Sequence, residues 1–141
     1  MALALMALLM VAAALAMQAA HDSHAYNLDK TDLLLRTRGV LDRIARDVRI
    51  ATAFEVPNSR TIDITLPDGT IHTYAWDGVQ GGDLTYTVTD GADVSTQILT
   101  GSVKAFAAGS TSPSCTVSIA LEGDLASAEA EITAIPRKAV F

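Results

Sequence analysis

The chain opens with a long run of apolar residues. Met1 to Met17 contain no polar side chain, and Gln18 is the first polar residue. Leu, Ala and Met are strong helix formers, and about 20 apolar helical residues span the hydrocarbon core of a bilayer. The pattern predicts an apolar helix over residues 1–20, long enough to cross a membrane. The side chains expected to face lipid or neighbouring helices include Leu5, Leu8, Leu9, Val11 and Leu15.

From residue 27 onward, apolar residues occupy only one face of the expected helix. Two rows with a period of seven form a stripe typical of an amphipathic helix. Arg43 and Asp47 fall on the opposite, solvated face, where their i,i+4 spacing permits a weak ion pair. The two rows are Leu34, Leu41 and Val48, and Thr37, Ile44 and Ala51. We expect Leu34, Leu41, Ile44 and Val48 to pack against a sheet.

The two helical segments are expected to form one continuous helix. No Gly or Pro separates the apolar run from the start of the amphipathic stripe. Pro57 disfavours a helical residue before it, so the helix is expected to end near residues 54–56. This divides the chain into an N-terminal helix over 1–53, with a membrane half at 1–20 and an amphipathic half at 27–53, and a globular domain over 54–141.

After Pro57 the apolar pattern changes to a period of two, which is typical of strands with one buried face. Alternating segments begin at Ile62, Leu84 and Cys115, and turn residues such as Asp68-Gly69 separate them. Further strands are expected at Ile71–Trp76, Val94–Leu99, Val103–Ala107 and Ala128–Ile135, with a loop over Gly109–Ser114. A sheet with one buried face needs a cover, and the helix offers an apolar stripe. The predicted fold is α+β: a long N-terminal α-helix packed against an antiparallel β-meander.

Charge is distributed unevenly along the chain. The net charge is −6, yet residues 27–53 carry six basic and four acidic groups, while residues 54–141 carry four basic and eleven acidic groups. Nucleic-acid binding requires a clustered basic surface. An acidic globular domain therefore argues against nucleic acid as a partner.

Residues with catalytic or metal-binding chemistry are few. Cys115 is the single cysteine, and its alternating surroundings predict a small buried hydrophobe. His72 is its only possible histidine partner in the globular domain, and no nucleophilic triad has suggestive spacing. We therefore expect no catalytic site. His21 and His24 are able to share a helical face around a metal, but no third ligand lies near in sequence, and the Asp-Gly pairs fit hairpin turns better than calcium loops. No metal or cofactor is expected.

The apolar run also has to be weighed against a cleavable signal peptide. Ala14 to Ala16 resemble a cleavage site, but the basic segment that precedes a signal core is missing, since Lys30 is the first basic residue. With basic residues only after the run, the positive-inside rule would leave the globular domain in the cytoplasm. The alternative is that the natural chain has residues before Met1.

Four segments resemble the type IV pilin-like superfamily, and most closely the minor pseudopilins of type II secretion, of the J type. The segment LDRIARDVRIATAF (Leu41–Phe54) resembles the amphipathic half of a pilin helix. The late strands of the subfamily are similar to ILTGSVKAFAAG and CTVSIALEG, and its closing strand is similar to AEITAIPRKAVF. The basic leader, the Gly-Phe-Thr motif and the early glutamate of pilin precursors are missing. We expect such a motif within roughly ten codons upstream of Met1.

The resemblance implies a structural subunit rather than an enzyme. It implies a single-pass protein of the inner membrane with its C-terminal domain in the periplasm, which joins a secretion or pilus-like filament through its N-terminal helix and contacts other pilin-like subunits. Ala12, Ala13, Ala14 and Ala16 would permit close helix approach. Two alternatives stay open: a single-span membrane anchor carrying an extracytoplasmic β-domain that binds a ligand or protein, and an exported soluble β-protein cleaved near Ala16.

Overall fold

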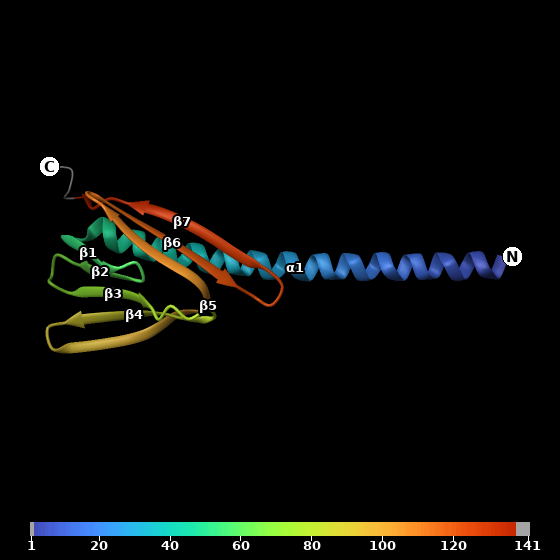
Figure 1. Ribbon diagram of the computed structural model, residues 1–141, viewed down its shortest axis with the longest axis horizontal. Coiled ribbons are helices and arrows are strands. Elements are labelled where there is room, and N and C mark those ends of the chain that lie inside the picture. Colours follow the sequence, from blue (N-terminus) through green and yellow to red (C-terminus); the bar gives the residue numbers. More distant parts are fainter. Residues whose placement is uncertain (1, 138–141) are drawn as a thin grey trace.

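A single continuous helix forms the N-terminal third of the molecule (Figure 1). The computed structural model describes the backbone of residues 2–137 and the side chains of residues 4–137. Met1 and residues 138–141, which the predicted helix and domain include, lie outside the described residues. Helix α1 runs over Ala2–Ile50, so the prediction of one uninterrupted helix is confirmed.

The predicted end of the helix near residues 54–56 is wrong. The helix ends at Ile50, and strand β1 occupies Ala53–Asn58. The backbone N–H of Thr52 already donates a hydrogen bond to the carbonyl of Thr65, at 2.9 Å. Pro57 is compatible with β1 because this strand lies at the edge of the sheet, where a missing N–H removes no essential ladder bond.

Seven antiparallel strands follow one another across a single sheet in chain order. This arrangement confirms the predicted α+β fold with a helix packed against a meander. The remaining strands are β2 (Thr61–Thr65), β3 (Ile71–Trp76), β4 (Gly82–Asp90), β5 (Asp93–Thr111), β6 (Ser114–Glu122) and β7 (Ser127–Ala134).

Strand β5 replaces two predicted strands and the first half of a predicted loop. It pairs with β4 through its first part and with β6 from Val103 onward. The pairing changes near Gly101–Ser102, where Ser102 has a φ of 59° and both ladders shift register. Bulges of this kind bend a strand without ending it, so the interval between the two predicted strands is a bend within one strand.

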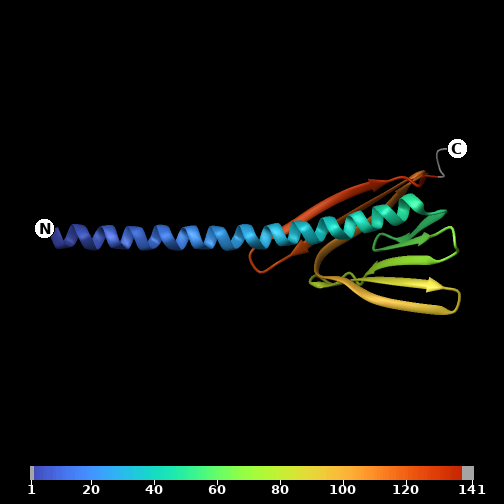
Figure 2. The ribbon, with the colours of Figure 1, turned by 180° about the vertical axis from the view of Figure 1, so that it is seen from behind.

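The sheet wraps around the second half of α1. Strands β6 and β7 run beside the helix, while β4 and the first part of β5 lie at the far side of the sheet (Figures 1 and 2). The end of β1 meets the second part of β5, where the N–H of Ala108 donates to the carbonyl of Ser59 at 2.8 Å. This curvature gives the helix contacts over more than one narrow stripe.

The hydrophobic core lies between α1 and the concave face of the sheet. The helix contributes apolar side chains from Leu33 to Val48, and Ala51 follows directly after the helix. Each strand from β2 onward contributes alternate residues, as the period-two pattern predicts. The largest fully buried side chains on the sheet are Ile62, Ile64, Tyr74, Leu84, Val103, Val117, Ile119 and Leu121.

Candidate functional site

The first half of α1 projects beyond the sheet and has no protein neighbours among the described residues (Figure 2). Its large apolar side chains are exposed to solvent in this single chain. The residues predicted to face a membrane or other helices, Leu5, Leu8, Leu9, Val11 and Leu15, have exposed fractions between 60 and 69%. The helix is long and apolar enough to cross a membrane. Contiguous exposed apolar surface of this kind marks an interaction site.

The second half of α1 carries the residues predicted to pack against the sheet. Leu41, Ile44 and Val48 have exposed fractions of 3, 1 and 0%, and Leu34 is half-buried against the core. Thr37 is fully buried, and its hydroxyl donates to the carbonyl of Leu33 at 2.7 Å, so burial leaves no unsatisfied donor there. One helix thus presents two apolar surfaces: the sheet covers one of them, and no described residue covers the other.

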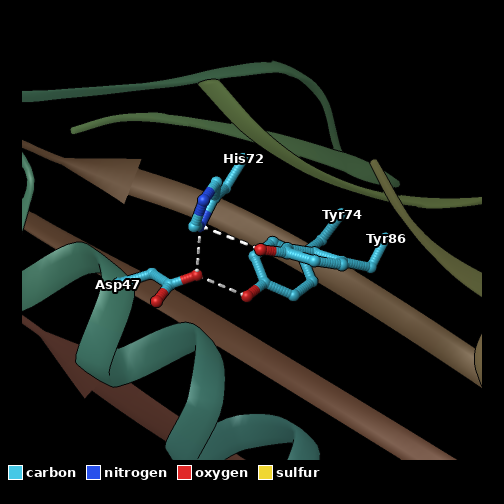
Figure 3. A network of polar contacts seen from close by, with 4 residues as sticks. All are labelled: Asp47, His72, Tyr74 and Tyr86. Atoms are coloured by element: carbon cyan, nitrogen blue, oxygen red, sulfur yellow. Dashed lines mark hydrogen bonds and ion pairs between the residues drawn. The ribbon is translucent and has the colours of Figure 1, made fainter. Parts of the chain in front are cut away.

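A polar network lies where the last turns of α1 cross β3 and β4 (Figure 3). Asp47 is 8% exposed, so its expected position on the solvated face of the helix is wrong. One carboxylate oxygen, Oδ2, accepts a hydrogen bond from the hydroxyl of Tyr74 at 2.6 Å and lies 2.8 Å from Nδ1 of His72. The expected ion pair with Arg43 is not formed among residues 4–137, because the carboxylate points to the sheet instead.

The carboxylate also determines which nitrogen of His72 carries a proton. A carboxylate accepts only, so Nδ1 of His72 is the donor to Asp47. The hydroxyl of Tyr86 lies 3.2 Å from the same nitrogen, and the His72 and Tyr86 rings meet edge to face with centroids 5.3 Å apart. Burial of the phenol, and then its hydrogen bond to Asp47, raises the pKa of Tyr74 far above its ordinary value. The network therefore holds a protonated phenol and an oriented imidazole.

Arg43 closes the network on the side of β4. Its guanidinium carbon lies 4.1 Å from the centroid of the Tyr86 ring, a cation–π geometry. Burial alone opposes the charge of Arg43, but its contacts with Tyr86 and Tyr74 outweigh burial and raise the pKa of the guanidinium. Two helical residues that the sequence placed on a solvated surface, Arg43 and Asp47, therefore specify how α1 sits on the sheet.

A second polar contact holds α1 where it leaves the sheet. Oδ2 of Asp29 accepts hydrogen bonds from the backbone N–H groups of Leu125 and Ala126, at 3.0 and 2.9 Å. Gly123 in the same loop leaves space for the Asp29 carboxylate, because a Cβ atom at position 123 would lie only 2.6 Å from Oδ2 of Asp29. This clasp joins the helix to the β6–β7 loop across a long stretch of sequence.

The network has the parts of an oriented base, with Nε2 of His72 on the side away from Asp47. Among residues 4–137, no serine, threonine or cysteine hydroxyl or thiol forms a hydrogen bond to Nε2 of His72. Cys115 is 1% exposed, and burial raises the pKa of its thiol to about 11, so it is a protonated core residue. His21 and His24 are exposed on α1, and the described part of the chain contains no group of three or more His, Cys, Asp or Glu side chains able to hold a metal.

The buried network was missed because its partners are distant in sequence. His72 and Tyr74 alternate on β3 and therefore share the face that meets the helix, and Tyr86 lies beside Tyr74 across the ladder to β4. Three polar aromatic residues on one buried face are a signal that a buried partner is needed.

Comparison of the chain with known protein families, with curated proteins and with solved structures gives no match.

Proposed function

We propose that the protein is a structural subunit of a pilin-like filament, of the minor pseudopilin type, that resides in the inner membrane before assembly. The observation that carries this proposal is the division of α1. Residues 4–20 are apolar except for Gln18 and are exposed, while one face of the second half is buried under the sheet and is anchored by Asp29 and Asp47. In a subunit of this shape, the exposed part of α1 leaves the lipid and packs against neighbouring helices while the globular domain stays folded.

The dimensions and composition of the exposed half suit both environments. At about 1.5 Å per residue, residues 2–20 extend roughly 30 Å, the thickness of a bilayer core. Small residues permit close helix approach in lipid or in a bundle, and Ala12, Ala13, Ala14 and Ala16 supply them. In this proposal the acidic domain lies in the periplasm and contacts other subunits, and the protein has no enzymatic activity.

The test compares membrane insertion with filament incorporation. The full chain, preceded by a basic pilin leader and a Gly-Phe-Thr…Glu segment, is produced in cells that contain a prepilin peptidase and a pilin-assembly ATPase, and sheared filaments are separated from membranes. Ala13→Leu keeps the helix apolar but removes a small contact, so we expect normal membrane content and reduced filament content. Leu8→Met is the matched control, and it should leave both unchanged.

One result would reject the filament function, and a second would reject only the proposed helix contacts. If the unchanged chain never enters the filament fraction although the apparatus is active, the proposal fails. If it enters the filament fraction and Ala13→Leu has no effect, the proposal that small residues form the helix contacts is rejected. The second candidate, a single-span anchor for a ligand-binding β-domain, is favoured by the first result, because the exposed apolar helix alone supports it.

A further inference from the structure

Among residues 2–137, the first part of β5 has one edge without a strand partner. Residues 93–100 pair with β4 on one side, and β6 begins to pair with β5 only at Val103. Every residue from Gly91 to Ile98 is exposed. Figures 1 and 2 show this part of β5 at the outer limit of the sheet, with the β4–β5 turn diverging from α1. Every second residue of Val94–Thr100 therefore presents a free backbone N–H and C=O.

This free edge lacks the usual protection against strand pairing. Exposed edges normally carry lysine, proline or an inward-pointing charge. The segment Val94–Thr100 contains no charged residue and no proline. Val94 and Ile98 are 66 and 64% exposed on the face that also carries Thr96. The edge is consequently suited to accept an extended strand.

The sequence of this edge is complementary to itself. When two copies pair antiparallel about a two-fold axis at Thr96, Thr96 faces Thr96 of the second copy. In that register Val94 of each copy faces Ile98 of the other, so apolar side chains meet twice on the same surface. Cross-strand pairs of apolar and threonine side chains stabilise antiparallel sheets, and a two-fold axis makes the interface isologous.

The charges at the two ends of the edge also match in this register. Asp93 of one copy falls opposite Leu99 of the other, on the face that Tyr86 and Arg43 occupy. A groove of about 500 Å³ lies there between α1 and β5, with Arg36 and Arg43 on the helix wall. No atom lies within 4 Å of the position of a Cβ on Gly39, so the helix leaves room in this groove. A second copy brings its own acidic turn toward Arg43 and toward Arg36, which also pairs with Asp32 at 2.8 Å.

We propose that the free edge of β5 is a self-association surface on which two copies of this chain pair Val94–Thr100 antiparallel and form one continuous sheet. The occupant is a second copy because residues 94–98 are complementary to themselves in the apolar pairs, and the same chain provides both the acidic β4–β5 turn and the basic side chains of α1. The surface is separate from the exposed half of α1, so this pairing does not depend on the filament function. A strand edge buries less area than a standard interface, so the association depends on protein concentration.

The first experiment tests the two-fold register in the full chain in detergent micelles. Residues directly opposite in a hydrogen-bonded pair have Cα atoms about 5.5 Å apart, within the range that a disulfide spans. Thr96→Cys should therefore form a disulfide-linked dimer on mild oxidation. Thr87→Cys is the matched control, because Thr87 and Thr96 share one hydrogen bond of 2.9 Å. In the paired sheet two Thr87 residues lie about 14 Å apart, too far to be linked.

The second experiment tests the register with mixed variants. Val94→Cys or Ile98→Cys alone should give little dimer, because each lies opposite the other position and not opposite itself. A mixture of the two variants should give several-fold more dimer than either one alone. Association through α1 is the same in all these proteins, so it is unable to produce this difference.

Two further variants test the apolar and charged contacts in the Thr96→Cys background. Ile98→Lys places a charge on the free edge and should abolish the dimer without lowering the melting temperature, since Ile98 is exposed. Asp93→Lys should reduce the dimer several-fold, whereas Glu131→Lys on β7 makes the same change in net charge and should not.

Three results would overturn the proposal. The first is a folded Thr96→Cys protein that stays monomeric at every concentration. The second is equal crosslinking of Thr87→Cys, which would show association without this register. The third is crosslinking of Thr96→Cys only after another protein is added, which would assign the edge to a different partner.

Discussion

Removal of the Asp47 carboxylate should destabilise the protein far more than removal of an exposed carboxylate on the same helix. Oδ2 of Asp47 accepts hydrogen bonds from Tyr74, which is fully buried, and from His72, which is mostly buried. A hydrogen bond to a charged group contributes about 1.5–3 kcal/mol, and a buried donor left without a partner costs about 1–3 kcal/mol. We therefore expect Asp47→Ala to lower the free energy of unfolding by about 3–4 kcal/mol.

A double-mutant cycle separates the Tyr74 bond from the rest of the network. Tyr74→Phe alone should cost about 1.5 kcal/mol, because it removes one hydrogen bond and leaves Asp47 with His72. In the Asp47→Ala background the Tyr74 hydroxyl is already unsatisfied, so Tyr74→Phe should cost nothing or restore stability. The coupling energy should therefore be about 1.5 kcal/mol or more.

Urea unfolding of the full chain in mild detergent, followed by the fluorescence of Trp76, measures these differences. Trp76 is the single tryptophan and lies at the end of β3, the strand that carries Tyr74. Asp32→Ala is the control, because Asp32 forms an exposed ion pair with Arg36 at 2.8 Å, and such pairs contribute about 0–1 kcal/mol. Equal losses for Asp47→Ala and Asp32→Ala would refute the structural role of the network.

Three other perturbations test the helix–sheet packing and the protonation of the core. Leu41→Asp buries an unpaired charge and should lower the free energy of unfolding in urea by at least about 3 kcal/mol. Leu35→Asp changes a position that is 65% exposed and should lower it by no more than about 0.5 kcal/mol. Similar losses for the two variants would contradict the packing of the helix on the sheet. Because the folded-state pKa of Tyr74 is raised above its ordinary 10.0, its contribution to stability is complete below pH 10.0 and is lost as pH rises further. Stability measured across this range should fall less steeply for Tyr74→Phe, and parallel curves would contradict the assignment. A chain that begins at Tyr26 should be soluble and folded without detergent by size-exclusion chromatography and circular dichroism, because buried apolar residues begin at Leu33; aggregation would show that the domain needs the first half of α1.

Local patterns predicted those parts of the fold that depend on residues close in sequence. The heptad stripe located Leu41, Ile44 and Val48 on the buried face, and the period of two located β2, β3, β4 and β6. The continuity of α1 followed from the lack of any helix breaker near residue 20. These features depend on spacing within one element, so no knowledge of its neighbours is required.

Features that depend on distant partners did not follow from the sequence. The short strand β1 contains Pro57, and only its place at the edge of the sheet makes that residue acceptable. Residues 94–99 and 103–107 were predicted as two strands because the sequence does not show that β4 and β6 flank one bent strand there. Asp47 has the spacing of a solvated i,i+4 partner of Arg43, and only the assembled β3 and β4 strands provide the hydroxyl and imidazole groups that permit its burial.

The clasp at Asp29 has a mechanical consequence when the helix is pulled. Tension along α1 reaches the β6–β7 loop first, because Asp29 binds that loop where the helix leaves the sheet. To slide out, the helix must shear all side-chain contacts between Leu33 and Ala51 at once, over about 27 Å. A sideways load instead peels the helix away one turn at a time, beginning at Asp29. The domain should therefore withstand a pull along its helix much better than a bend across it.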